Sequence, residues 1–195
     1  YVILSDGRRE WTNHYVQVSE HGLQPTLGLM WSAAERLALG LTLSQNFIFD
    51  SETKRQSSQE SILNTSTPPA IITYADKRAF PLQLRLGAAW FHSDRLLLAA
   101  DIIHHTAHDY DFAGARIERR AVTDLAVGVE YYLNSTWALR GGVYTSYANT
   151  PKITGTAANQ EENIDVFGIT GSLSRFTRNS SLTVGLGYGQ GSGRA

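Results

Sequence analysis

The chain has 195 residues and no cysteine, so disulfides and thiolate metal sites are excluded. Its formal net charge is −1 and it has no basic cluster, which gives no electrostatic basis for binding nucleic acid. The longest apolar run, at 96–100, is far shorter than the roughly 20 apolar residues that a spanning helix needs.

In residues 1–69 the sequence pattern predicts a hairpin between two irregular stretches. Residues 1–20 have no steady period, which predicts the end of one strand followed by a loop. Apolar and small residues then alternate along 23–31 and 37–49, and a period of two predicts strands rather than helices. A short turn at 33–36 joins these two strands. The polar stretch 50–69 predicts a long loop.

A second hairpin is predicted at 80–103. Apolar residues alternate along 80–91 and 96–103, and a tight turn at 92–94 separates the two runs. If this turn has three residues, Arg85 lies opposite Asp101 on the face of small residues. The sequence therefore predicts an ion pair between the two strands.

The most regular hairpin is predicted at 122–148. Leu, Val and Tyr occupy one face of its first strand, and Asp, Ala, Gly and Glu occupy the other. A turn at 134–136 would place Glu130 opposite Arg140 on the small face, again as an ion pair. A last hairpin is predicted around a tight turn at 177–178.

Short turns alternate with long polar connections, which include 106–120 and 149–163. This alternation and strands of roughly 10 to 12 residues are typical of outer-membrane barrels. Trp31, Trp90 and Trp137 fall at the short-turn ends of their strands, where aromatic residues form a membrane-interface belt.

The two faces of each hairpin distinguish a membrane wall from a soluble sandwich. A sandwich would place long charged side chains on its outward face, whereas here the polar face is mostly Gly, Ala and Ser. Such a face is typical of a closed wall around a crowded or partly wet interior, with the apolar face against lipid. We therefore predict an all-β, antiparallel, up-and-down transmembrane β-barrel in the outer membrane of a Gram-negative bacterium. About eight strands are visible, and we expect 1–195 to be a single domain and a segment of a larger barrel.

Three segments carry a family resemblance, namely 21–31 (HGLQPTLGLMW), 36–42 (RLALGLT) and 127–144 (VGVEYYLNSTWALRGGVY). Over most of residues 21–190 the chain resembles the C-terminal portion of the long-chain fatty-acid transporter (FadL/TodX) family. The resemblance implies a larger barrel that moves hydrophobic compounds inward across the outer membrane. It carries over no ligand-binding residue.

Of three other motifs, none predicts a metal site, a nucleotide site or a catalytic site. His104 and His105 point to opposite faces of a strand, and His108 lies about 13 Å from His104 at roughly 3.3 Å per residue, so a zinc site is not predicted. The glycines of 185–191 have the period of a strand face, and no helix follows as a dinucleotide motif requires. No serine has the context of a hydrolase nucleophile. We predict no enzyme activity, no cofactor and no metal.

The leading hypothesis is passive uptake of hydrophobic compounds such as long-chain fatty acids, with membrane lipid and the solute as partners. A second is a structural barrel that binds a partner protein without transport, and a third is a soluble ligand-binding barrel. The two ion pairs could line a transport path, or merely brace the wall, which we favour. Candidate contacts for an apolar solute are Ile48, Phe49, Ile62 and Leu63.

Overall fold

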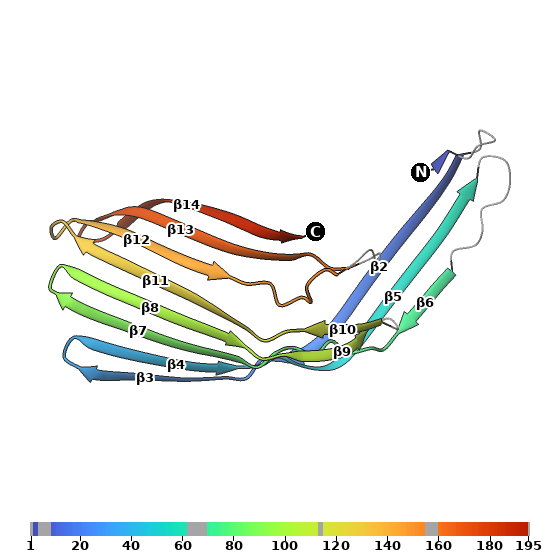
Figure 1. Ribbon diagram of the computed structural model, residues 1–195, viewed down its shortest axis with the longest axis horizontal. Coiled ribbons are helices and arrows are strands. Elements are labelled where there is room, and N and C mark those ends of the chain that lie inside the picture. The colour runs from blue at the N-terminus through green and yellow to red at the C-terminus, as the bar shows by residue number, and fades with distance from the viewer. Residues whose placement is uncertain (1, 4–8, 62–69, 113–114, 155–159, 195) are drawn as a thin grey trace. The chain divides into compact units, whose positions relative to one another are not determined.

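The computed structural model describes residues 2–3, 9–61, 70–112, 115–154 and 160–194. Figure 1 shows strands joined by turns and loops. In this described part of the chain, no helix is long and apolar enough to cross a membrane. The strands form two compact units. The eight-strand unit comprises Gln24–Asn46, Phe80–Asp109 and Glu118–Ala195. The four-strand unit comprises Tyr1–Leu23, Phe47–Ala79 and Tyr110–Ile117.

The eight-strand unit is one antiparallel sheet in which neighbours along the chain are neighbours in space. Its strands are β3 (Thr26–Ala34), β4 (Leu37–Ser44), β7 (Gln83–Ser93), β8 (Leu96–His105), β11 (Val122–Tyr132), β12 (Trp137–Ser146), β13 (Asn163–Phe176) and β14 (Ser181–Arg194). Their order is β14-β13-β12-β11-β8-β7-β4-β3. The predicted all-β, up-and-down antiparallel architecture is confirmed. The sheet is open, with β3 and β14 at its edges among the described strands.

The hairpin of β11 and β12 has the register that the sequence predicts. Glu130 pairs with Arg140, and the amide of Leu133 donates to the carbonyl of Trp137 over 3.0 Å. The turn is held by the Asn134 side chain, whose Oδ1 accepts the amides two and three residues further on, at 2.8 and 3.0 Å. An asparagine that caps its own turn in this way fixes the turn length and therefore the register.

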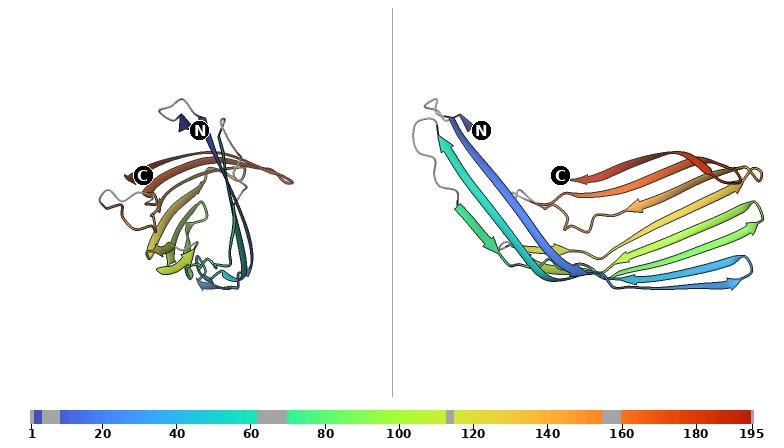
Figure 2. Two further views of the ribbon diagram at one scale, coloured as in Figure 1. Left: turned by 90° about the vertical axis from the view of Figure 1, so that its right-hand side faces the viewer. Right: turned by 180° about the vertical axis from the view of Figure 1, so that it is seen from behind.

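The two faces of this sheet differ in exposure as well as in composition. Along β11 the residues of the apolar face, Leu125, Val127, Val129 and Tyr131, are 41% to 53% exposed. The residues between them are half-buried and form the small-residue face. Figure 2 shows the eight strands as a curved sheet. Ala138 is the one hydrophobic side chain that is buried among the described residues. Hydrogen-bonded ladders rather than an apolar core therefore hold the sheet.

The four-strand unit contains a sheet of order β1-β2-β5-β6. Its strands are β1 (Val2–Ile3), β2 (Arg9–Leu23), β5 (Phe47–Ser61) and β6 (Ala70–Tyr74). The loops predicted over 9–20 and 50–61 are therefore wrong. The two long strands pair from Glu10 with Ser61 to Leu23 with Phe47. Both strands mix polar and apolar residues on each face, so they carry no alternation that a sequence pattern could detect.

A β-bulge interrupts this ladder at Gly22. A Cβ atom at that position would lie 2.6 Å from the carbonyl oxygen of Phe47 and 2.8 Å from Cδ1 of Ile48. Only glycine allows the two strands to approach so closely, which explains the residue at the bulge.

The long connections differ from one another. The predicted polar connection 106–120 contains two short strands, β9 (His108–Phe112) and β10 (Ala115–Arg119), which pair with each other. In the connection between β12 and β13, the described residues 147–154 and 160–162 form no strand, in agreement with the predicted polar loop.

The predicted pairing of Arg85 with Asp101 is wrong. Arg85 lies opposite Ile103, and Asp101 lies opposite Gly87. The turn between β7 and β8 consists of Asp94 and Arg95 and lies later than the predicted turn at 92–94, and a bulge between Phe91 and Ser93 changes the register again. Together they place Arg85 opposite Ile103, two residues beyond Asp101. The side chains still share the small-residue face, but in the described part of the chain neither has an ion-pair partner.

Candidate functional site

A hollow of about 540 Å³ lies on the small-residue face of the eight-strand unit. Five neighbouring strands line it, from β8 across to β14. The lining includes Leu97, Ala99, Asp101, Ala126, Gly128, Glu130, Arg140, Gly142, Tyr144, Thr170, Ser172, Gly185 and Gly187. Most of this surface is apolar, with polar groups at a few positions, as is common in sites for small apolar ligands.

The hollow exists because small residues meet across consecutive strands. Gly128 pairs with Gly142, which pairs with Thr170, which in turn pairs with Gly187. Where glycine stands on the inner side of a strand, no side chain projects from the wall. The row therefore forms a shallow depression in the sheet.

Tyr144 borders the hollow on the side of the long loops. It lies directly opposite Gly168, and its ring covers that residue so closely that a Cβ atom at Gly168 would overlap the ring. Its hydroxyl oxygen reaches to 3.7 Å from the place where a Cβ atom of Gly189 would lie. The phenol ring therefore lies flat across β13 toward β14, and places an aromatic face and a hydroxyl beside the hollow.

A hydrogen-bonded chain borders the hollow on the side of the short turns. Arg140 Nη2 donates to Glu130 Oε1 at 3.0 Å, and its Nη1 donates to Ser174 Oγ at 2.6 Å. The Ser174 hydroxyl also lies 2.8 Å from the Thr183 hydroxyl and is fully buried. The predicted pairing of Glu130 with Arg140 is thus present. It is part of a hydrogen-bonded chain that extends across four strands, from β11 to β14.

Aromatic rings adjoin this chain closer to the turns. The rings of Tyr132 and Phe176 stack with centroids 6.4 Å apart. The guanidinium carbon of Arg140 lies 5.8 Å from the centroid of Phe176. This contact adds a cation–π interaction to the hydrogen bonds that orient Arg140.

Asp101 adds a carboxylate to the lining of the hollow. It leans over Gly87, where a Cβ atom would lie 2.8 Å from Asp101 Oδ1. Arg85, on the same face, donates instead to Gln83 Oε1 at 3.2 Å. Among these four predicted residues, the small-residue face therefore carries one ion pair, Glu130 with Arg140, and two charges without an ion-pair partner within the described ranges, Arg85 and Asp101.

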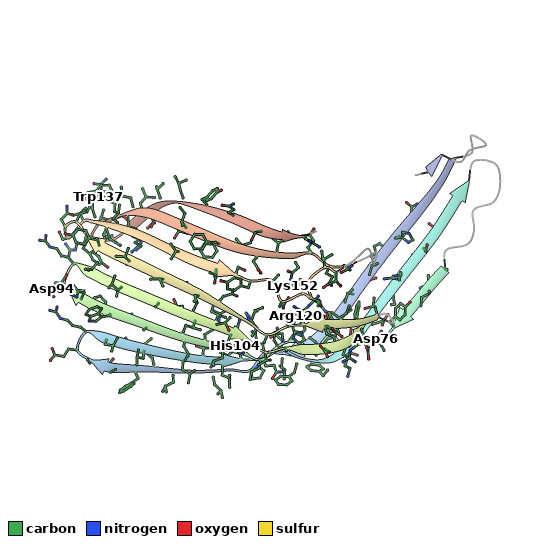
Figure 3. All side chains as sticks on the ribbon, in the orientation of Figure 1. Asp76, Asp94, His104, Arg120, Trp137 and Lys152 are labelled. Carbon is green, nitrogen blue, oxygen red and sulfur yellow. The ribbon has the colours of Figure 1, made fainter. Side chains whose placement is uncertain are left out.

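The three tryptophans lie on the apolar face near the short turns. Trp31 and Trp90 are 61% and 45% exposed. The Arg175 guanidinium carbon lies 5.7 Å from the ring centroid of Trp137. Figure 3 shows Trp137 and Asp94 at the turn end of the sheet, with His104, Arg120 and Lys152 nearer its other end. This placement suits an interfacial belt, whose role stays a prediction.

Of the predicted apolar solute contacts, Ile48 and Phe49 are described by the structure, and neither lines the hollow. Ile48 and Phe49 lie on β5 of the four-strand unit, where neighbouring residues point to opposite faces. Phe49 is 57% exposed. Ile62 and Leu63 lie outside the described residues. The role of all four stays a prediction.

The histidines near the end of β8 each have a different environment. His104 Nδ1 lies 2.8 Å from the Thr123 hydroxyl, and His105 Nε2 lies 2.7 Å from Gln83 Nε2. Among the described residues, no three His, Asp or Glu side chains are grouped so that they could hold a metal ion.

In each of two ion pairs outside the eight strands, an arginine lowers the pKa of its glutamate partner. Hydrogen bonds from Arg78 hold the pKa of Glu20 below its ordinary value of 4.5, against the opposing effect of burial. Arg119 likewise lowers the pKa of Glu161 from 4.5, again mainly by hydrogen bonding. Both carboxylates are therefore charged at neutral pH, and both pairs fix polar segments that connect strands.

Tyr144, Thr170 and Ser174 are site residues that were not predicted from the sequence. Their position on the small-residue face follows from the alternation along β12 and β13. However, only the register between these strands brings Ser174 to Arg140, and no tight turn joins them to fix that register.

No protein-family model and no curated protein matches the sequence. The fold is similar to a solved structure described as "CymD monoaromatic hydrocarbon channel", with a TM-score of 0.64 and 17% sequence identity. The likeness covers 88% of this chain and 47% of that chain, so the chain spans about half the length of the channel. At this identity the likeness establishes the fold alone. The chain thus has the antiparallel sheet architecture of a protein described as a hydrocarbon channel.

Proposed function

We propose that this chain forms part of the wall of an outer-membrane channel. Hydrophobic small molecules pass through this channel into a Gram-negative cell by passive diffusion. The membrane-spanning part is the eight-strand unit, with its apolar face against hydrocarbon and its small-residue face toward the path of the solute. No cofactor or reaction is needed for such passage.

The observation that carries the proposal is the reversed distribution of apolar side chains in this sheet. Large aliphatic and aromatic residues are exposed on one face, and the opposite face is small, less exposed and hollowed. A soluble monomer rarely exposes so large a contiguous apolar surface. A barrel wall in a bilayer has its apolar band outside and its polar positions inside.

The hollow provides a binding site for the solute along this path. Gly128, Gly142 and Gly187 provide a smooth apolar floor, and Tyr144 provides an aromatic border. Few polar groups of the floor must lose water when an apolar molecule enters, so the cost of desolvation is small. The fold likeness to a hydrocarbon channel is consistent with this use of the wall.

Two solute classes follow from these arguments, and we propose both for direct comparison. The family resemblance in the sequence favours a long-chain fatty acid. The size of the hollow, about 540 Å³, also accommodates a monoaromatic hydrocarbon. The whole protein's substrate is the one whose uptake depends on the hollow.

The test compares solute uptake in cells that lack the gene and in cells complemented with unmodified protein, Gly128→Trp or Gly40→Trp. Both glycines lie on the small-residue face, but only Gly128 lines the hollow. A Cβ atom at Gly128 has no neighbour nearer than 3.7 Å, and one at Gly40 none nearer than 4.0 Å, so both backbones accept a side chain. We expect Gly128→Trp to reduce uptake of the labelled hydrophobic solute severalfold, and Gly40→Trp to leave it near the unmodified rate.

Equal amounts of each protein in the outer-membrane fraction are the control for folding. Uptake that does not change when the gene is deleted, with the protein still in that fraction, would favour the scaffold alternative. Recovery of the protein in buffer without detergent would favour the soluble alternative. Either result contradicts the proposal.

A further inference from the structure

The turn end of the eight-strand unit carries an excess of positive charge. Its four tight turns and their flanking residues, at 33–37, 92–96, 133–137 and 175–180, contain four arginines and two carboxylates, namely Arg36, Arg95, Arg175, Arg178, Glu35 and Asp94. Arg36 is paired, with Nη2 3.0 Å from Asp94 Oδ1. In the described part of the chain, the other three arginines have no carboxylate partner.

Arg175 occupies a distinctive position among them. It is the last residue of the apolar face on β13 before the turn, and it pairs directly with Trp137 on β12. The next residue pair on this face is Leu139 with Leu173, which are 52% and 40% exposed. An exposed apolar surface thus ends at an exposed guanidinium group that lies 5.7 Å from an indole ring.

A guanidinium group at this level has a specific chemical preference. It remains charged at all relevant pH values and presents paired N–H donors whose spacing matches two oxygens of a phosphate. Tryptophan favours the boundary between hydrocarbon and headgroups. Stacking on Trp137 restricts Arg175 to that boundary, and Arg178 in the adjoining turn adds a second cation two residues beyond the strand end.

We propose that this arginine-rich turn end, centred on Arg175 and Trp137, binds the phosphate groups of anionic phospholipids in the adjacent leaflet. The inference rests on the proposed function, because it requires the eight-strand unit to span a bilayer. The bound phospholipid anchors the depth of β13 and of its neighbour β14, every residue of which is exposed.

The experiment uses the full chain in vesicles, in a Trp11→Phe/Trp31→Phe/Trp90→Phe background, so that Trp137 is the single tryptophan. Quenching of Trp137 by brominated phosphatidylglycerol is compared with quenching by brominated phosphatidylcholine, which gives a relative binding constant. Each arginine at a membrane surface contributes about five-fold to the affinity for anionic lipid. We expect a preference for phosphatidylglycerol that falls at least about five-fold in Arg175→Gln/Arg178→Gln and weakens with added salt.

The matched control is Arg120→Gln/Lys152→Gln, which removes the same charge nearer the other end of the sheet (Figure 3). We expect this control to keep the preference. Because each protein is compared with itself in two lipids, the loss of the contact between Arg175 and Trp137 does not bias the ratio.

Three results would overturn the inference. They are equal quenching of the unmodified Trp137 by both lipids, an unchanged preference after Arg175 and Arg178 are replaced, and an equal loss in the control. Quenching by neither lipid would overturn the proposed function as well. A selective loss of preference in vesicles, together with no solute uptake in complemented cells, would support the lipid inference and contradict only the transport function.

Discussion

At the scale of single residues, Arg140 links three strands of the wall. Its guanidinium group donates to Glu130 on β11 and to Ser174 on β13 from its own position on β12. Glu130 has a side chain that is only 15% exposed, so its charge depends on this partner. The arrangement fits a brace of the wall better than a freely accessible binding group.

Replacement of Arg140 tests this role. Arg140→Ala leaves the Glu130 carboxylate without its donor, and we expect the free energy of unfolding to fall by about 1–2 kcal/mol. Glu130→Ala should then cost less in the Arg140→Ala background than in the unmodified protein. A double-mutant cycle from denaturant titrations in detergent micelles measures this coupling. Strict additivity of the two substitutions would contradict the pairing.

At the scale of elements, the pairing of β12 with β13 depends on a contact between a large side chain and a glycine. Tyr144 lies over Gly168 and reaches toward Gly189, so one ring covers two neighbouring strands. A large side chain opposite a glycine fills the space that the glycine leaves. Such pairs fix the register where no tight turn connects the two strands.

A methyl group at Gly168 tests this contact. Gly168→Ala places a Cβ atom within the ring of Tyr144, so we expect the ring to be displaced and the stability to fall by about 1–3 kcal/mol. Gly40→Ala is the matched control, because it adds the same methyl group to the same face in open space and should change stability by less than about 0.5 kcal/mol.

Thermal or denaturant unfolding of both variants measures the difference. In a Tyr144→Ala background, Gly168→Ala should lose most of its cost, because the ring is no longer there to be displaced. A cost that is the same with and without the ring would show that another neighbour of Gly168 is responsible.

At this scale, the register of a hairpin could be predicted from the sequence only where its turn has a defined length. The hairpin of β11 and β12 was predicted to the residue, since Asn134 caps a turn of defined length. The hairpin of β7 and β8 was predicted in place but not in register. Its turn lies at 94–95 and a bulge precedes Ser93, and the net shift of two residues keeps the side chains on their predicted faces, so the sequence pattern carries no sign of it.

At the scale of the whole molecule, the described residues lack an apolar core, since Ala138 is the one buried hydrophobic side chain among them. An exposed apolar face would be a liability in water and is an advantage in hydrocarbon. The environment of that face is therefore the property on which the membrane proposal depends.

An arginine on the apolar face distinguishes the two environments. Val127 is 53% exposed, so in water Val127→Arg should change stability by no more than about 0.5 kcal/mol. In a bilayer the same change at mid-depth should cost about 2–4 kcal/mol. Thr170→Arg is the control, because Thr170 lies on the opposite, small-residue face, paired with Gly142 and Gly187, and should tolerate a charge better. Equilibrium unfolding from lipid vesicles measures both, and equal tolerance of the two substitutions would contradict the membrane assignment.

The sequence by itself determined the strand content of the eight-strand unit, the two faces of each strand and the approximate place of its tight turns. These properties are local, because side-chain alternation and turn chemistry act over a few residues. Only the tertiary structure decided the long pairing of β2 with β5, the shifted partner of Asp101, the contact of Arg140 with Ser174 and the hollow beside Tyr144. Each of these depends on register between distant segments, and a period of two is satisfied equally well by any register that shifts by two residues.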